Sequence, residues 1–298
     1  MLLDWFFKNK AKYSQKTPRL KYSINGNSLS IGNFTGEYNR SPNSKFILAW
    51  KQQNENGEYI LLERGKIKLQ AKIRHPDNGM VSNSGVFILS DLTSKGMYGI
   101  FQIINTDGET LIKQRCKAKI GQCGISDDGR FAVCQALEST SKSDSCKLYF
   151  FDIRERKLLW KKLPETLGSE HNWAGSYRFD TKNKVLYLIH AENRAYRYTF
   201  EGTFIDSKLY RHDCISIGND IEFLEAIKEL KVELSENPDP RDYDALITPL
   251  KRGLNRFSDK DTRSKIHRLL GEISHLQRND IEAIKHFETA LKLNPRVG

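Results

Sequence analysis

The sequence predicts an all-β domain of the β-propeller type followed by a domain of α-helical repeats. Two strand-and-turn elements recur along the first 217 residues, and the apolar spacing changes from that of strands to that of helices at Asn219. The 298 residues are enough for two ordinary domains. We expect a docking segment over residues 1–20, a β-propeller-like domain over 21–217 and a helical domain over 219–298.

The first recurring element is a short polar turn that opens onto an apolar strand. Asn, Asp, Ser and Gly favour such turns because they tolerate left-handed backbone angles or cap their own backbone. The β-branched and aromatic residues that follow are typical of a buried strand. The copies span residues 41–50, 82–89, 126–133 and 180–189.

The second element is a hairpin that follows each copy of the first. Its turns lie at residues 63–65, 106–108, 154–156 and 200–202, with an extra copy at 25–27. A period of about 40 to 45 residues is typical of a four-stranded propeller blade. Four units and the extra hairpin predict about five blades, with the hairpin pairing a strand at Cys214–Ile217 to close the ring. A twisted sandwich of the same hairpins is the alternative.

The segment Leu148–Trp160 carries a family resemblance. It resembles a WD40-like propeller repeat, with Phe151-Asp152 where those repeats carry Trp-Asp. The resemblance implies a propeller architecture over roughly residues 20 to 217, which offers rigid loops for binding other proteins.

The second half of the chain has helical spacing. Asn219 or Asp220 can cap a helix that carries Ile221, Leu224 and Ile227 on one face. The last segment resembles a tetratricopeptide repeat (TPR), in which small residues let two helices approach closely. The resemblance implies two repeats and an exposed apolar face, because so few repeats rarely bury one another. The residues that carry it are Leu270, Gly271, Ala283, Phe287, Ala290 and Pro295.

Positive charge is concentrated in the first 217 residues, which hold 34 basic and 22 acidic residues, against 14 and 15 in the remainder. Much of it alternates with apolar residues along two predicted strands, which places the cations on one face. Protection of an exposed sheet edge is one interpretation. Contact with phosphates or with an acidic protein is the other. The cations are Lys66, Lys68, Lys72 and Arg74, then Lys113, Arg115, Lys117 and Lys119.

The first helix of each TPR supplies the concave groove, so the resemblance implies a partner-binding groove in the tail. Its candidate residues in the last repeat are Lys265, Arg268, Glu272 and His275. Glu272 stands where carboxylate-clamp members of the family carry Asn, which argues against chaperone-tail binding.

No catalytic, metal or cofactor motif is present in the sequence. The five cysteines are scattered, which favours a reducing, cytoplasmic location where they act as small apolar residues. Residues 124–131 imitate the spacing of a phosphate-binding loop but lack its Lys and Ser/Thr. A lyase or metal site on the propeller axis would need several histidines to converge, and we expect surface or hydrogen-bonded histidines instead at His75, His171, His190 and His212.

The apolar start of the chain, Met1–Phe7, is followed by Lys8, Lys10 and Lys12. A secretory signal has the opposite order, and no apolar run is long enough to span a bilayer. We interpret residues 1–20 as a segment that docks on the first domain, with a weak membrane-surface anchor as the alternative.

These features favour a non-enzymatic scaffold or adaptor for protein–protein interaction, binding through the TPR tail and the propeller faces. One alternative is a basic accessory protein that associates with nucleic acid through the propeller surface. The second alternative is a propeller enzyme of unknown activity.

Overall fold

The computed structural model describes residues 21–53, 56–92, 98–166, 173–191, 194–235 and 243–297; the predicted docking segment 1–20 lies outside them. The chain is mostly β, with several antiparallel sheets and a helical C-terminal part. It divides into two compact units, residues 1–164 with 175–186, and residues 165–174 with 187–298. The division falls inside the last sheet, before the boundary predicted near residue 218.

The first sheet contains six strands in the order β1-β2-β3-β4-β5-β6. These strands are β1 (Tyr22–Asn25), β2 (Ser28–Ile31), β3 (Phe34–Arg40), β4 (Phe46–Gln53), β5 (Asn56–Glu63) and β6 (Lys66–Ile73). Every neighbouring pair is antiparallel, so the sheet is a simple meander.

The next two sheets have four strands each and the last has three. The second contains β7 (Pro76–Val81), β8 (Phe87–Leu92), β9 (Gly99–Ile104) and β10 (Thr110–Cys116). The third contains β11 (Ile120–Ile125), β12 (Phe131–Ala136), β13 (Leu148–Asp152) and β14 (Lys157–Lys162). The fourth contains β15 (Ser176–Asp180), β16 (Val185–Ile189) and β17 (Ala195–Thr199).

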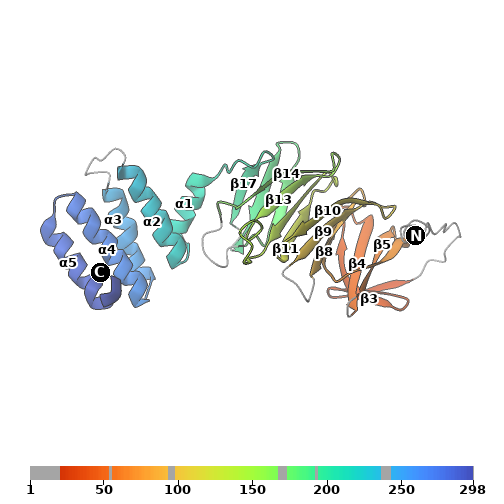
Figure 1. The fold of residues 1–298 in the computed structure, drawn as a ribbon, viewed down its shortest axis with the longest axis horizontal. Coiled ribbons are helices and arrows are strands. Elements are labelled where there is room, and N and C mark those ends of the chain that lie inside the picture. Colours follow the sequence, from red (N-terminus) through yellow and green to blue (C-terminus); the bar gives the residue numbers. More distant parts are fainter. Residues whose placement is uncertain are drawn as a thin grey trace. The chain divides into compact units, whose positions relative to one another are not determined.

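Successive sheets of the first unit pack face to face, as Figure 1 shows from orange to green. Apolar residues from both sheets fill each interface, which is how blade-like sheets bury their two faces. The first and second sheets share Phe46, Leu48, Trp50, Tyr59, Leu61, Val81, Phe87, Leu89 and Ile104. The second and third share a core that includes Ile88, Phe101, Ile103, Ile120, Cys123, Ala132, Cys134, Tyr149 and Phe151.

The predicted turns open the predicted strands. In two copies a serine hydroxyl caps the strand that follows, since Phe46 N donates to Ser41 Oγ (3.0 Å) and Phe131 N donates to Ser126 Oγ (2.9 Å). Gly65 and Gly108 adopt positive φ angles of 76° and 83° in the hairpin turns, a conformation that glycine enters without strain. The segment 124–131, whose spacing imitates a phosphate-binding loop, forms one of these turns, between β11 and β12.

The predicted ring closure is wrong. Residues 214–216 belong to a helix, α1 (Ser207–Ser216), and the N-terminal hairpin extends the first sheet as β1 and β2. The described residues therefore form four sheets, not about five. The apolar residues of the hairpin cover the outer face of the first sheet, where a neighbouring blade would lie in a closed ring. The cluster contains Leu29, Ile31, Phe34, Ile47, Ala49, Ile60 and Leu62.

The helices of the second unit are α1 and then α2 (Asp220–Ser235), α3 (Asp244–Arg256), α4 (Lys260–Leu276) and α5 (Asp280–Leu293), followed by a 3-10 turn at Pro295–Val297. They run from cyan to blue in Figure 1. Asn219 begins α2 through a reciprocal capping box with Glu222, in which each backbone N–H donates to the other side chain at 2.9 Å. The change of period at Asn219 thus predicted a real helix start.

The pairing of α4 with α5 follows the predicted contacts with one exception. Leu270, Gly271, Ala283 and Ala290 are buried, and Ser264 Oγ donates to Ala290 O at 2.8 Å. A Cβ added to Gly271 would lie 2.7 Å from Phe287 Cε1, so the absence of a side chain at Gly271 leaves room for the ring. However, Phe287 remains 36% exposed rather than buried, because it lies at the edge of the helix pair.

An apolar face is exposed on α5, as the repeat count predicts. Ile281 and Ile284 are 73% and 57% exposed, and Leu291 lies on the same stripe of the helix. Pro295 is also exposed, just after the helix ends.

Candidate functional site: a basic edge surface and a helical groove

The predicted basic strands lie at the edges of their sheets. β6 is the last strand of the first sheet, and β10 is the edge strand of the second. Along β6 exposed and half-buried residues alternate, with the cations exposed and the apolar residues turned toward the protein. All eight predicted cations are exposed at these two sheet edges, and we call them the basic edge surface: Lys66, Lys68, Lys72, Arg74, Lys113, Arg115, Lys117 and Lys119.

The cations of this surface form no direct ion pairs within the described ranges, although Glu58, Asp77 and Asp91 lie near enough to interact electrostatically with Lys72, Lys119 and the pair Arg74 and Lys113, respectively. Among the described residues, none of its eight side chains forms an ion pair within 4 Å. The guanidinium of Arg115 lies 4.5 Å from the ring centre of Tyr98, a cation–π contact that leaves its charge in place. Glu58, the nearest acid opposite Lys72 on β5, pairs with Lys51 at 3.2 Å and accepts from Gln70 at 2.6 Å.

A third edge strand repeats the pattern and was not identified from the sequence. β14 exposes Lys157 and Lys161 at the edge of the third sheet. Here the charge is compensated, since Lys161 Nζ lies 2.5 Å from Asp144 Oδ1. The alternation of Lys157, Leu158 and Lys161 was the available signal, although it is shorter than in the first two strands.

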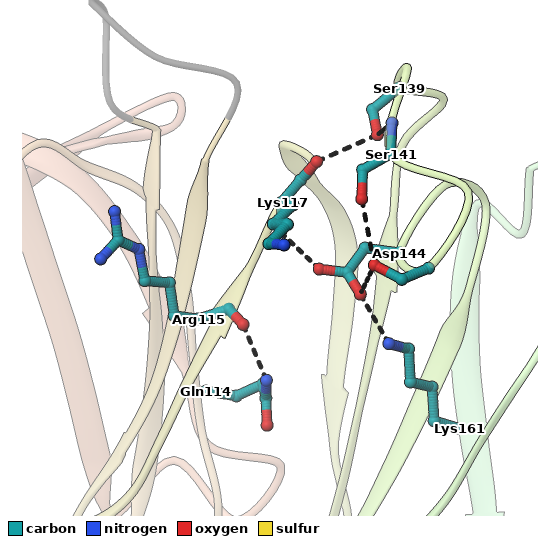
Figure 2. Close-up of polar contacts among 8 residues, drawn as sticks. Gln114, Arg115, Lys117, Ser139, Ser141, Asp144 and Lys161 are labelled. Carbon is teal, nitrogen blue, oxygen red and sulfur yellow. Dashed lines mark hydrogen bonds and ion pairs between the residues drawn. The ribbon is translucent and has the colours of Figure 1, made fainter.

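Asp144 links the edges of the second and third sheets, as Figure 2 shows. Its carboxylate accepts the backbone N–H of Lys117 at 2.5 Å as well as the ammonium of Lys161. Burial alone raises the pKa of Asp144, but the hydrogen bonds from Lys161 and Lys117 outweigh it and hold the pKa at about 2. Asp144 is therefore ionised at neutral pH and fixes one boundary of the basic edge surface.

The second candidate site is a groove of about 560 Å³ that lies between α2 and α4. Leu224, Val232 and Leu269 give it an apolar lining, and four basic side chains stand against one acidic side chain around them. The polar residues are Lys228, Lys231, Ser235, Lys265, Arg268 and Glu272. Three of the predicted groove residues, Lys265, Arg268 and Glu272, thus meet in one cavity.

Glu272 pairs with two of the four cations of the groove. It pairs with Lys231 from α2 and, at 3.2 Å, with Arg268 from its own helix. Lys265 pairs with Asp261 at 2.5 Å one turn earlier. His275 does not line the groove, since its Nδ1 hydrogen-bonds Asp280 at 2.8 Å. The residues from α2 were missed because the first repeat is degenerate and its groove positions were not aligned.

The histidines of the strand ends have separate local contacts. His75 shares a hydrogen bond with Gln52 at 3.2 Å, and the ring of His190 packs 5.5 Å from that of Tyr196. His212 lies 3.5 Å from Asp213, and His171 lies outside the described residues.

The five cysteines are free thiols, and four of them are buried. Burial raises the pKa of Cys116 and of Cys214 to about 11, so both are protonated at neutral pH. Within the described ranges, no group of three or more potential ligand side chains is placed to hold a metal ion. No helix in the described part of the chain is both long and apolar enough to cross a membrane.

Comparisons with known proteins add little. No family model matches the chain, and no curated protein is similar to it. Among solved structures, it is similar to Kuenenia stuttgartiensis hydrazine synthase (14% identity, 55% of this chain and 50% of that one, TM-score 0.39). It is also similar to the Dos1 propeller (9% identity, 60% of this chain and 52% of that one, TM-score 0.40). A third similar structure is Kluyveromyces lactis Hsv2 (11% identity, 61% of this chain and 58% of that one, TM-score 0.38).

The chain thus spans about half the length of the first two structures. Likeness at this level carries no functional argument, so the function has to be inferred from the residues themselves.

Proposed function

We propose that this protein is a non-enzymatic interaction scaffold, with TPR-like helices that recruit an extended acidic segment of a partner protein. The observation that carries the proposal is the α2–α4 groove, where apolar side chains are surrounded by Lys228, Lys231, Lys265 and Arg268. A cavity with an apolar lining and a few converging polar groups is typical of a binding site.

The chemistry of the groove defines the partner segment. Aliphatic side chains of the segment would cover Leu224 and Leu269, and its carboxylates would pair with the basic rim. Glu272 competes for Lys231 and Arg268, so an incoming carboxylate has to displace it or share these cations. We expect a segment with two or more acidic residues next to a Leu, Ile or Phe.

A display library of random 12-residue peptides, selected on the full-length protein, tests this proposal. We expect enrichment of peptides that combine Asp or Glu with aliphatic residues. Lys231→Glu/Arg268→Glu should weaken binding of a selected peptide at least about tenfold, because attraction becomes repulsion at two positions. Fluorescence anisotropy with the labelled peptide measures the change.

Lys251→Glu/Arg252→Glu is the matched control. It makes the same charge change on exposed residues of α3 that do not line the groove, and it should leave the affinity within about twofold. Selection of basic or purely polar peptides would contradict the proposal, as would equal losses in the two variants.

A further inference from the structure

We propose that the basic edge surface binds the phosphate backbone of double-stranded nucleic acid. This activity is separate from recruitment through the groove, because the surface lies on β6, β10 and the residues that follow them, in the first unit. The carrying observation is the group of eight exposed cations at two neighbouring sheet edges, none of which forms an ion pair within 4 Å with an acid among the described residues.

The two sheet edges hold these charges on a fixed backbone, although not in one regular row. Lys68 is the extra residue of a β-bulge, and the cross-strand partners of Lys66 and Lys72, which are Glu63 and Glu58, place those two lysines on opposite faces of the first sheet. On the second sheet, Lys113 and Arg115 are alternate residues of β10, about 6.6–6.8 Å apart, and Lys117 follows the strand. Because hydrogen bonds of the sheets fix the backbone, ordering a phosphate against these edges costs only side-chain entropy.

The residue types of the surface indicate whether its partner is a nucleic acid or a protein. Six of the eight cations are lysines, a residue type that is depleted from protein–protein interfaces. The apolar residues between them, such as Leu69 and Ala71, are packed against the core of the two sheets and do not offer contact area. Point charges without exposed apolar surface fit a phosphate backbone better than a protein partner.

The same composition favours a duplex over a single strand. Single-strand binding sites use aromatic side chains on which successive bases stack. None of the eight residues is aromatic, and the neighbouring Tyr98 is engaged by Arg115. A duplex presents phosphates from two strands at high density, so it can contact the cations of both sheet edges without unstacking any base.

The test is the salt dependence of binding to a labelled 20-base-pair DNA of arbitrary sequence. We compare the full-length protein with Lys66→Gln/Lys68→Gln/Lys113→Gln/Arg115→Gln by fluorescence anisotropy between 50 and 200 mM KCl. The slope of log K against log salt should flatten by about 0.9 for each lost contact, hence by up to about 3.6, and low-salt affinity should fall at least about tenfold. Because the four residues are exposed, the variant should melt at the wild-type temperature.

Lys182→Gln/Lys184→Gln/Lys251→Gln/Arg252→Gln is the control, since it removes four exposed charges elsewhere on the chain and should leave the slope unchanged. The proposal is overturned if the two variants lose affinity equally, or if the edge variant keeps the wild-type slope. Tighter binding to single-stranded DNA than to the duplex would also overturn it. So would edge-dependent binding to vesicles containing 30% phosphatidylserine but not to DNA. The edge variant should retain its selected groove peptide, so failure here is distinguishable from failure of the proposed function.

Discussion

Asp144 shows how one buried carboxylate organises the edge of the β unit. It accepts hydrogen bonds from a backbone N–H that follows β10 and from a lysine on β14. Ser139 Oγ adds a bond to Lys117 O at 3.0 Å from the same loop (Figure 2). The loop after β12 thereby joins the edges of the second and third sheets.

The first prediction concerns the stability that Asp144 provides. Its pKa is about 2 in the folded protein and 3.8 when unperturbed, which corresponds to about 2 kcal/mol at neutral pH. Because the folded pKa is depressed, this stabilisation is complete above about pH 4 and is lost as the pH falls through about 2. Asp144→Asn should lower the free energy of unfolding by about 2 kcal/mol at pH 7 and by much less near pH 2.

Urea unfolding at both pH values measures this difference. Asp107→Asn, which changes an exposed carboxylate of the β9–β10 turn, is the control and should have little effect at either pH. An Asp144→Asn protein as stable as the wild type at pH 7 would contradict the prediction. It would show that the backbone N–H of Lys117 and the ammonium of Lys161 are stabilised as well by hydrogen bonds to water as by the carboxylate.

Residue-scale predictability depended on periodicity. The exposure of the basic residues was predictable because they alternate with apolar residues, but the single face that this alternation predicts is interrupted by a bulge at Lys68 and by the end of β10 at Cys116. The link through Asp144 could not be predicted, because Lys117 and Asp144 are 27 residues apart and meet through an irregular loop. The α2 half of the groove was missed for a similar reason, since Lys228 and Lys231 meet Arg268 only after the helices fold together.

At the scale of elements, the ring of Phe287 on α5 occupies the space that a side chain at Gly271 of α4 would fill. Any side chain on Gly271 would have to move the ring of Phe287, whose nearest atoms lie 2.7–3.0 Å from the added Cβ. The ring is partly exposed, so it can move outward at the cost of its packing.

The second prediction is a coupling between these two positions. Gly271→Ala should destabilise by about 1 kcal/mol despite the higher helix propensity of alanine, and Phe287→Ala by about 2 kcal/mol because its ring is only partly buried. The double variant should lose less than the sum, since removing the ring removes the collision. Thermal unfolding of the four proteins measures the cycle; strict additivity would mean that the close approach carries no strain.

The third prediction concerns the His267–His286 pair, whose Nδ1 atoms lie 3.0 Å apart between α4 and α5. Burial and the neighbouring histidine lower the pKa of His267, and burial with nearby lysines lowers that of His286. Glu282, 3.7 Å from His286, opposes this shift, whereas Arg263, Lys251 and Lys285 add to it. The neutral pair is therefore favoured in the folded state.

Since both folded pKa values are depressed, the pair contributes stability above about pH 6.5 that declines as the pH falls toward the folded values. The melting temperature of the helical unit should fall between pH 7 and pH 5. His267→Phe should reduce this dependence, and His275→Gln, an exposed histidine of the same helix, should preserve it. Helical circular dichroism at 222 nm follows the transition; an unchanged pH dependence in His267→Phe would contradict the assignment.

Helices and strands formed as the sequence predicted wherever the local residue pattern and the tertiary contacts favour the same structure. The polar turns, the strands after them and the capped start of α2 all agree with their local pattern. The predicted strand over Cys214–Ile217 was wrong, because residues 214–216 belong to α1. Asp206, held by Arg197 at 2.6 Å, precedes α1, and Tyr210 of that helix packs against Tyr196. These tertiary contacts override a short β propensity.

At the scale of the whole molecule, the chain has two different candidate binding surfaces. The β unit carries the basic edge surface, and the helical unit carries a groove in which apolar area and charge are combined. The two surfaces share no residue. Substitutions in one should therefore leave binding at the other unchanged, and losses at both sites from one set of substitutions would point to misfolding instead.

The most direct test of the scaffold proposal is hydrogen–deuterium exchange of the full-length protein with and without a selected acidic peptide. We expect slower amide exchange in α2 and α4, at residues 220–235 and 260–276, with the peptide present. The strands β6 and β10 should exchange as in the free protein. Protection confined to the sheets, or to the exposed face of α5, would contradict the assignment of the groove as the site that recruits the partner.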